Sequence, residues 1–127
     1  MHRFWNPENI APKVLTTGVT AKIASGEKMM LSLITFAPNA VVPTHSHPHE
    51  QMGMMVSGTM ELTIAGETRV FCGNELFLVP GGVPHAVKAG PGGAVALDAF
   101  SPPREEYREA GGEHIFPAVG DTPPLRG

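Results

Sequence analysis

Short apolar runs separated by turn residues recur along most of the chain. The clearest run is residues 59–64, where Met60, Leu62 and Ile64 alternate with polar residues. This alternation is typical of a strand that buries one face. The 15 glycines and 13 prolines mostly stand between such runs rather than cluster, so tight turns join many short strands. The pattern favours an all-β sandwich or barrel. The predicted strands are residues 14–19, 28–36, 51–56, 59–64, 68–71, 75–79, 85–89 and 94–100.

One short helix is expected after the last strand. Ser101 can cap it, prolines suit its first turn, and residues 104–110 continue it until two glycines at 111–112. A chain of 127 residues has the size of one core, so we expect a single domain over 1–127. Residues 117–127 are expected to form a loose tail.

Four methionines lie in the central predicted hairpin. Met52, Met54 and Met60 share one face by parity, and Met55 has the other. Methionine fills irregular gaps, so we expect these side chains to pack in the core. Apolar residues on both faces also suit a sandwich or a dimer interface.

Composition and charge exclude several function classes. The net charge is −3 and there is no basic stripe, so nucleic acid is not an expected partner. The single cysteine, Cys72, rules out an internal disulfide framework; we expect a buried thiol in a reducing compartment. No run approaches the ~20 apolar residues that span a bilayer. No secretory signal is visible, so the expected location is the cytoplasm, with no membrane partner.

Three histidines carry the strongest chemical signal. His45 and His47 are two residues apart on an extended segment, so their side chains point the same way. His85 follows a second turn segment, residues 80–84, a few strands later. Neutral imidazole is the commonest nitrogen ligand for divalent first-row metals. The three side chains therefore predict one metal site inside the β-structure.

At these residues the chain resembles the cupin superfamily, whose members are small double-stranded β-helix (jelly-roll) barrels. The first cupin motif has His-x-His, a further ligand and a glycine; the second has a glycine, Pro-x-Gly and a histidine. The matching residues are His45, His47, Gln51 and Gly58 in the first motif and Gly73, Pro80, Gly82 and His85 in the second. Both motifs lie within residues 38–89. The resemblance implies a cupin jelly-roll barrel, a divalent metal ion and a homodimer.

The sequence offers three candidates for the fourth metal ligand. Gln51 stands where cupins usually have a glutamate. Glu50 is one residue early and, on a strand, points to the opposite face from His47, so Gln51 is the expected ligand. A bulge at Pro48 would instead bring in Glu50 or His49, and both alternatives stay open. The ligand set does not distinguish Ni, Zn, Mn or Fe.

A further resemblance concerns residues 98–107. They are similar to the ending of small cupins of pectin and alginate breakdown, which convert 4,5-unsaturated uronate monosaccharides into linear keto sugars. In that family an Asp-x-Phe-x-x-x-Arg pattern works beside a metal site of three histidines and a glutamine. Asp98, Phe100 and Arg104 match it and are the expected catalytic residues. The implied substrate is a small anionic sugar.

These residue types suit that chemistry. Three histidines and a glutamine add no negative charge, so a bound divalent ion keeps its full charge toward the cavity. Arg104 can clamp a carboxylate through two hydrogen bonds. Burial beside Phe100 favours protonated Asp98, whereas nearby cations favour the carboxylate, which suits a general acid–base. Two other functions compete: another metal-dependent cupin enzyme, such as a dioxygenase or lyase, and a non-catalytic cupin that binds a metal or small molecule.

Overall fold

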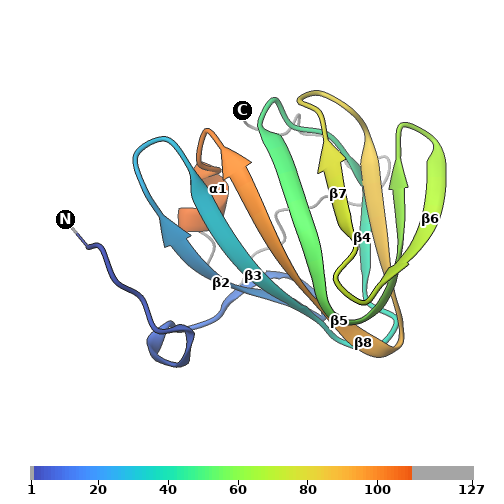
Figure 1. Ribbon diagram of the computed structural model, residues 1–127, viewed down its shortest axis with the longest axis horizontal. Coiled ribbons are helices and arrows are strands. Elements are labelled where there is room, and N and C mark those ends of the chain that lie inside the picture. The colour runs from blue at the N-terminus through green and yellow to red at the C-terminus, as the bar shows by residue number, and fades with distance from the viewer. Residues whose placement is uncertain (1, 110–127) are drawn as a thin grey trace.

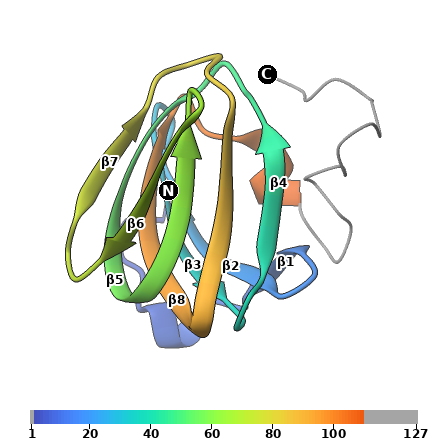
Figure 2. The ribbon, with the colours of Figure 1, turned by 90° about the vertical axis from the view of Figure 1, so that its right-hand side faces the viewer.

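Two walls of antiparallel β-strands form a cup around an apolar core (Figures 1 and 2). The structure is a computed structural model that describes residues 2–109. Its elements are η1 (Pro7–Asn9), β1 (Lys13–Thr16), β2 (Val19–Ser25), β3 (Met30–Phe36), β4 (Val41–His45), β5 (Glu50–Ile64), β6 (Glu67–Cys72), β7 (Leu76–Val79), β8 (His85–Ser101) and α1 (Glu105–Glu109). The predicted all-β jelly-roll with one short C-terminal helix is confirmed.

The two walls share their longest strands. The large wall consists of β1, β2, β3, the second half of β8, the first half of β5, and β7. The small wall consists of β4, the first half of β8, the second half of β5, and β6. Figure 1 shows β5 and β8 bending at one end of the cup, where the walls meet, while the walls diverge at the other end.

The turn residues predicted to end strands at 57–58 and 90–93 instead bend continuous strands, which corrects the sequence prediction. Gly58 and Gly93 both have positive φ, +76° and +78°. A Cβ at Gly58 would lie 2.2 Å from the carbonyl oxygen of Gly93. Only glycine tolerates this conformation and this approach, so β5 and β8 pass from one wall to the other without ending.

Irregular pairing in β5 reverses which side chains face the core. The register with β8 shifts between Met55 and Ser57 and again between Gly58 and Met60. As a result Met55 and Met60 are both buried although they differ in parity. The prediction of core packing is confirmed for these two methionines. It is wrong for Met52, which is 52% exposed on the outside of the large wall.

The core lies between the walls, and its apolar side chains come from both. The fully buried large members include Leu15, Val19, Met30, Met55, Met60, Leu62, Val79 and Phe100. Strand β2 is not among the strands expected from the sequence pattern. Cys72 is exposed, so the prediction of a buried thiol is wrong.

The C-terminal helix is shorter than predicted within the part of the chain that the structure describes. It begins at Glu105, after Arg104. The predicted helix end at 111–112 and the predicted tail over 117–127 lie outside the described residues. No helix within residues 2–109 has the length and hydropathy to cross a lipid bilayer.

Candidate functional site

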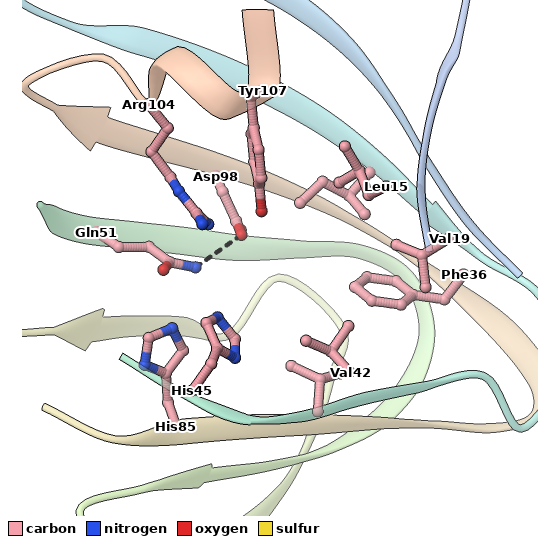
Figure 3. Close-up of a pocket in the computed structure, with 12 residues that line it drawn as sticks. Leu15, Val19, Phe36, Val42, His45, Gln51, His85, Asp98, Arg104 and Tyr107 are labelled. Carbon is pink, nitrogen blue, oxygen red and sulfur yellow. Dashed lines mark hydrogen bonds between the residues drawn. The ribbon is translucent and has the colours of Figure 1, made fainter. Parts of the chain in front are cut away.

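Five of the seven predicted site residues line the cavity between the two walls that Figure 3 draws; His47 and Phe100 are buried next to it but are not among its lining residues. The small wall supplies His45, the last residue of β4, and His85, the first residue of β8, which face each other in register. The large wall supplies Gln51 from β5 and Asp98 from β8. Arg104 enters from the segment that leads into α1.

The histidine cluster consists of His45, His47 and His85, whose candidate ligand atoms all lie within 4.8 Å of one another. Each ring is oriented by a backbone carbonyl, which can only accept a hydrogen bond. Nδ1–H of His45 donates to Pro43 (2.8 Å), and Nδ1–H of His85 donates to Val83 (2.9 Å). The Nε2 atoms of these two rings therefore keep their lone pairs, as metal-binding imidazoles do.

The third ring gives the clearest sign of a cation. Nδ1–H of His47 donates to the carbonyl of His49 (3.1 Å), which leaves a lone pair on its Nε2. Yet that Nε2 lies 3.1 Å from Oε1 of Gln51. The Gln51 amide is oriented with its NH₂ donating to Asp98 Oδ2 at 2.9 Å, so Oε1 is also an acceptor. A neutral imidazole has one N–H and cannot satisfy both contacts.

A second proton on His47 would relieve this contact, but the site opposes it. Burial, the guanidinium of Arg104 and the neighbouring His85 lower the pKa of His47 to about 3. Burial and His85 also lower the pKa of His45 to about 3. Nε2 of His85 is buried with no hydrogen-bond partner among the described residues. The unpartnered Nε2 of His85 and the acceptor-to-acceptor contact at Nε2 of His47 fit a divalent cation.

The structure places the three candidates for fourth ligand differently. Gln51 is buried beside His47. Glu50 is exposed, on the opposite face of β5. His49 is buried but outside the histidine cluster; it contributes its carbonyl to His47, and its own Nδ1 has no partner among the described residues. This arrangement favours Gln51, and metal coordination by it stays a prediction.

Asp98 is the buried carboxyl group of the site, only 5% exposed. Burial raises its pKa to about 7, although the Gln51 hydrogen bond and the positive charge of Arg104 act in the opposite direction. Its Oδ1 lies against Gly53, the residue opposite it on β5, where a Cβ would be 2.4 Å away. Glycine at this position leaves room for the carboxyl group. Near neutral pH, both the acid and the carboxylate of Asp98 are therefore populated.

Arg104 is almost fully buried, with 1% exposure, and its contacts include Glu106, Tyr107 and Phe100. Its Nε donates to Oε1 of Glu106 at 2.9 Å. Its Cζ lies 4.2 Å from the ring centroid of Tyr107 and 5.5 Å from that of Phe100. The aromatic rings favour a cation over their faces and fix the plane of the guanidinium. Figure 3 shows Arg104 and the Tyr107 hydroxyl directed toward Asp98.

The cavity is polar at one end and apolar at the other. The apolar end is lined by Leu15, Val19, Ile34, Phe36, Val42 and Val87. The whole cavity, polar and apolar ends together, has a volume of about 30 Å³. That is room for about one water molecule, so a monosaccharide requires side chains at the mouth to move.

Sequence reasoning missed two residues that shape the site. Tyr107 lies three positions after Arg104, at a spacing that places side chains together on a helix, and this signal was available. Gly53 could not be singled out, because its role depends on the pairing of β5 with β8.

Comparison with known proteins identifies the family. The cupin domain profile matches residues 32–100, which include all three clustered histidines and Asp98. The chain belongs to the cupin family. This cupin is 27% identical over 109 residues to the pectin degradation protein KdgF of Dickeya dadantii; the match covers 84% of this chain and 99% of that protein.

Solved structures show the same relationship. KdgF from Halomonas sp. superposes with a TM-score of 0.78 at 27% identity, covering 84% of this chain and 98% of that chain. An RmlC-like cupin from Shewanella frigidimarina superposes with a TM-score of 0.80 at 26% identity, covering 84% and 96%. This cupin is therefore similar over most of its length to small cupins that it covers almost completely.

Proposed function

We propose that this cupin is a metal-dependent enzyme that converts 4,5-unsaturated uronate monosaccharides into linear keto sugars. One observation carries the proposal: Asp98, whose pKa burial raises to about 7, is joined through Gln51 to the histidine cluster. A proton-transfer group and a candidate metal site thus share one cavity. The similarity to proteins named KdgF, one of them a pectin degradation protein, supports the substrate class. We expect the enzyme to act in the cytoplasm.

His45, His47, His85 and Gln51 are the residues that would hold the metal. All four are uncharged, and a divalent ion bound to them supplies Lewis-acid stabilisation of negative charge on substrate oxygens. The donors do not select among Ni, Zn, Mn and Fe.

Asp98 is the proposed general acid. Near neutral pH a substantial fraction of it carries a proton, which it delivers to C4 of the sugar double bond, so that positive character develops at C5. Water adds to C5 and returns a proton to Asp98, which restores the acid. The proton of the new C5 hydroxyl passes to the ring oxygen as the bond from C5 to that oxygen breaks; the oxygen stays on C1 as a second hydroxyl, and the hydrated aldehyde at C1 loses water. The product is a linear sugar with a ketone at C5.

Arg104 and Phe100 position the substrate in this scheme. The guanidinium binds the uronate carboxylate, and the planar arrangement of its donors sets the carboxylate plane. Phe100 is buried with its ring 5.9 Å from that of His47, and it adds apolar surface on the same face of β8 as Asp98. Desolvation of this kind keeps the pKa of Asp98 high.

The test uses unsaturated uronates released by a polysaccharide lyase. The metal-loaded protein should remove the ultraviolet absorbance of the conjugated double bond, and NMR of the product should show a C5 ketone. Asp98→Asn should reduce the rate by a factor on the order of 1000 or more, with unchanged metal content. Unchanged absorbance with the metal-loaded wild-type protein would refute the proposal. Turnover by Asp98→Asn at the wild-type rate would refute the role of Asp98.

The same assay separates the competing functions. Oxygen uptake on another substrate, with no effect on uronates, would identify a dioxygenase. Tight binding of a metal or small molecule without turnover would identify a binding protein. The raised pKa of Asp98 beside the cluster favours catalysis over binding alone, because strongly shifted pKa values in a cavity concentrate at catalytic sites.

A further inference from the structure

Glu106 is a largely buried acid next to Arg104, and the proposed reaction does not use it. Its side chain is only 11% exposed, and its Oε1 accepts a hydrogen bond from Nε of Arg104 at 2.9 Å. The neighbouring glutamate on α1, Glu105, has a different environment. Its side chain is 61% exposed, and it accepts a hydrogen bond from Nη1 of Arg108 at 2.8 Å. Glu106 is thus the acid that is paired with a cavity-lining side chain.

The contact with Glu106 occupies one edge of the Arg104 guanidinium. A guanidinium presents its N–H donors in one rigid plane, on Nε and on the two Nη nitrogens. A carboxylate binds it through two parallel hydrogen bonds, either at the side, through Nε and one Nη, or at the end, through both Nη nitrogens. Because Nε already donates to Glu106, a carboxylate in the cavity cannot take the side position without displacing that residue.

The ring of Tyr107 restricts the same guanidinium in a second direction. Cζ of Arg104 lies 4.2 Å from the centroid of this ring, which therefore covers one face of the group. The hydrogen bond at Nε sets the rotation within the plane, and the ring sets the plane itself. Figure 3 shows the end of Arg104 that carries the two Nη nitrogens directed toward Asp98. The end position therefore faces the cavity, where a substrate would lie.

The negative charge of Glu106 also bears on Asp98, the other carboxyl group near this guanidinium. Oδ2 of Asp98 accepts from Gln51, and its Oδ1 has no hydrogen-bond partner among the described residues, so the guanidinium does not bind Oδ1. A buried cation that loses its counter-ion is strongly unfavourable. Without Glu106, the buried guanidinium would therefore turn toward Asp98, and the proposed acid and the proposed carboxylate-binding group would bind each other.

We propose that Glu106 is a positioning residue that acts through Arg104. It blocks the side position, so that the uronate carboxylate binds across the two Nη nitrogens, and it holds the guanidinium away from the carboxyl group of Asp98. This role rests on the proposed function, because it takes a uronate carboxylate as the ligand of Arg104. The preference of the site for an acidic sugar over a neutral one then depends on Glu106, although Glu106 does not touch the sugar.

The experiment measures the binding of galacturonate and of galactose, its neutral counterpart, to the metal-loaded protein by titration calorimetry. Neither sugar has a double bond to react. The wild type should bind galacturonate about 10-fold or more tightly than galactose, and Glu106→Ala should lose most of this preference. Glu106→Gln keeps an acceptor for Nε and should retain the preference to within about 3-fold. Glu105→Ala, at an exposed position on the same helix, is the matched control and should behave as the wild type. Metal content should be the same in all four proteins.

Three results would overturn this role of Glu106. The first is a wild-type protein with no preference for galacturonate, because Arg104 then binds no carboxylate. The second is a folded Glu106→Ala variant that keeps the full preference. The third is an equal loss in Glu106→Gln and Glu106→Ala, because the hydrogen bond at Nε would then not be decisive.

A crystal structure of the metal-loaded wild type with galacturonate decides the question if Glu106→Ala does not fold. A carboxylate across both Nη nitrogens, with Nε still on Glu106, supports the role. A carboxylate at Nε with Glu106 displaced, or one away from Arg104, overturns it. None of these measurements needs turnover, so selective binding without conversion of unsaturated uronates would refute the proposed reaction and leave the role of Glu106 standing.

Discussion

The two halves of the cavity are built in different ways. In the histidine half, each ring is oriented by a carbonyl two residues away in sequence: Pro43 for His45, His49 for His47 and Val83 for His85. In the acid half, Asp98 is fixed by Gln51, which is 47 residues away. The histidine half therefore depends on local sequence, and the acid half on the pairing of β5 with β8.

Because of this difference, metal binding by the histidine half and proton transfer by the acid half should be lost through different substitutions. A change in a histidine removes a ligand without moving Asp98. A change in the packing around Asp98 displaces the acid but leaves the ring orientations intact, because their hydrogen bonds are local. Gln51 touches both halves, so its loss does not discriminate between them.

The largest effect is expected from His85→Ala. The bound metal should fall from roughly one ion per chain to near zero, and activity on unsaturated uronates should fall by a factor of about 100 or more. Elemental analysis and the ultraviolet assay measure the two quantities. His2→Ala, at an exposed position, is the control. Full metal content in His85→Ala would remove this residue from the ligand set.

Gly53→Ala should break the acid half alone. The new Cβ would lie 2.4 Å from Oδ1 of Asp98 and 2.2 Å from Cζ of Phe77, so the carboxyl group must move. We expect activity to fall by about 10- to 100-fold with unchanged metal content. Gly92→Ala, where nothing lies within 4 Å of the added Cβ, should behave as the wild type. Loss of metal from Gly53→Ala would contradict the separation of the halves.

Tyr107 offers a finer test of the acid half. Tyr107→Leu removes the ring beneath the guanidinium of Arg104, and the KM for the uronate should rise by about 10-fold. Tyr107→Phe keeps the ring and should change KM by about 2-fold or less. Steady-state kinetics distinguish the two variants. Equal KM values for Phe and Leu at this position would show that the ring does not hold Arg104.

The smallest expected effect is a change in stability with pH, because the histidine half and the acid half contribute to the pH dependence with opposite signs. His45 and His47 have a pKa of about 3 when folded and 6.5 when unfolded, so the unfolded chain binds more protons between these values and stability falls as the pH falls. Asp98 has a pKa of about 7 when folded against 3.8, so its contribution falls as the pH rises. Two histidines outweigh one carboxyl group.

The metal-free protein should therefore lose stability as the pH falls from 6.5 toward 4, as urea unfolding with a chelator would measure. Asp98→Asn removes the opposing contribution, so its loss of stability should be steeper than that of the wild type. A shallower dependence in Asp98→Asn would mean that Asp98 is not protonated in the folded protein at these pH values.

The sequence predicted the histidine half better than the acid half, because the histidine half depends on residues close together in sequence and the acid half on strand pairing. Alternation along residues 45–51 places His45, His47 and Gln51 on one face, and the structure brings them together. The same alternation gives Asp98 and Phe100 one face, and both are buried. Their distance from the histidines depends on strand pairing, which alternation does not encode. Only the resemblance to uronate-processing cupins implied that Asp98 and Phe100 lie beside the metal site.

Predictions failed where the backbone departs from regular geometry. Met52 and Met60 share one parity and were both expected in the core, but the shifts of register in β5 place them on opposite faces. Turn residues at 57–58 and 90–93 predicted strand ends, whereas glycines there allow bends. In the sequence, a glycine is equally compatible with a strand end and with a bend in a continuous strand. Only the close approach of Gly58 to Gly93 in the structure distinguishes the two.

Anomalous diffraction from crystals grown with a divalent metal tests the central claim most directly. We expect one strong peak within about 2.3 Å of Nε2 of His45, His47 and His85, with Oε1 of Gln51 completing the contacts. A metal-bound crystal whose peak lies elsewhere, away from these three nitrogens, would contradict it.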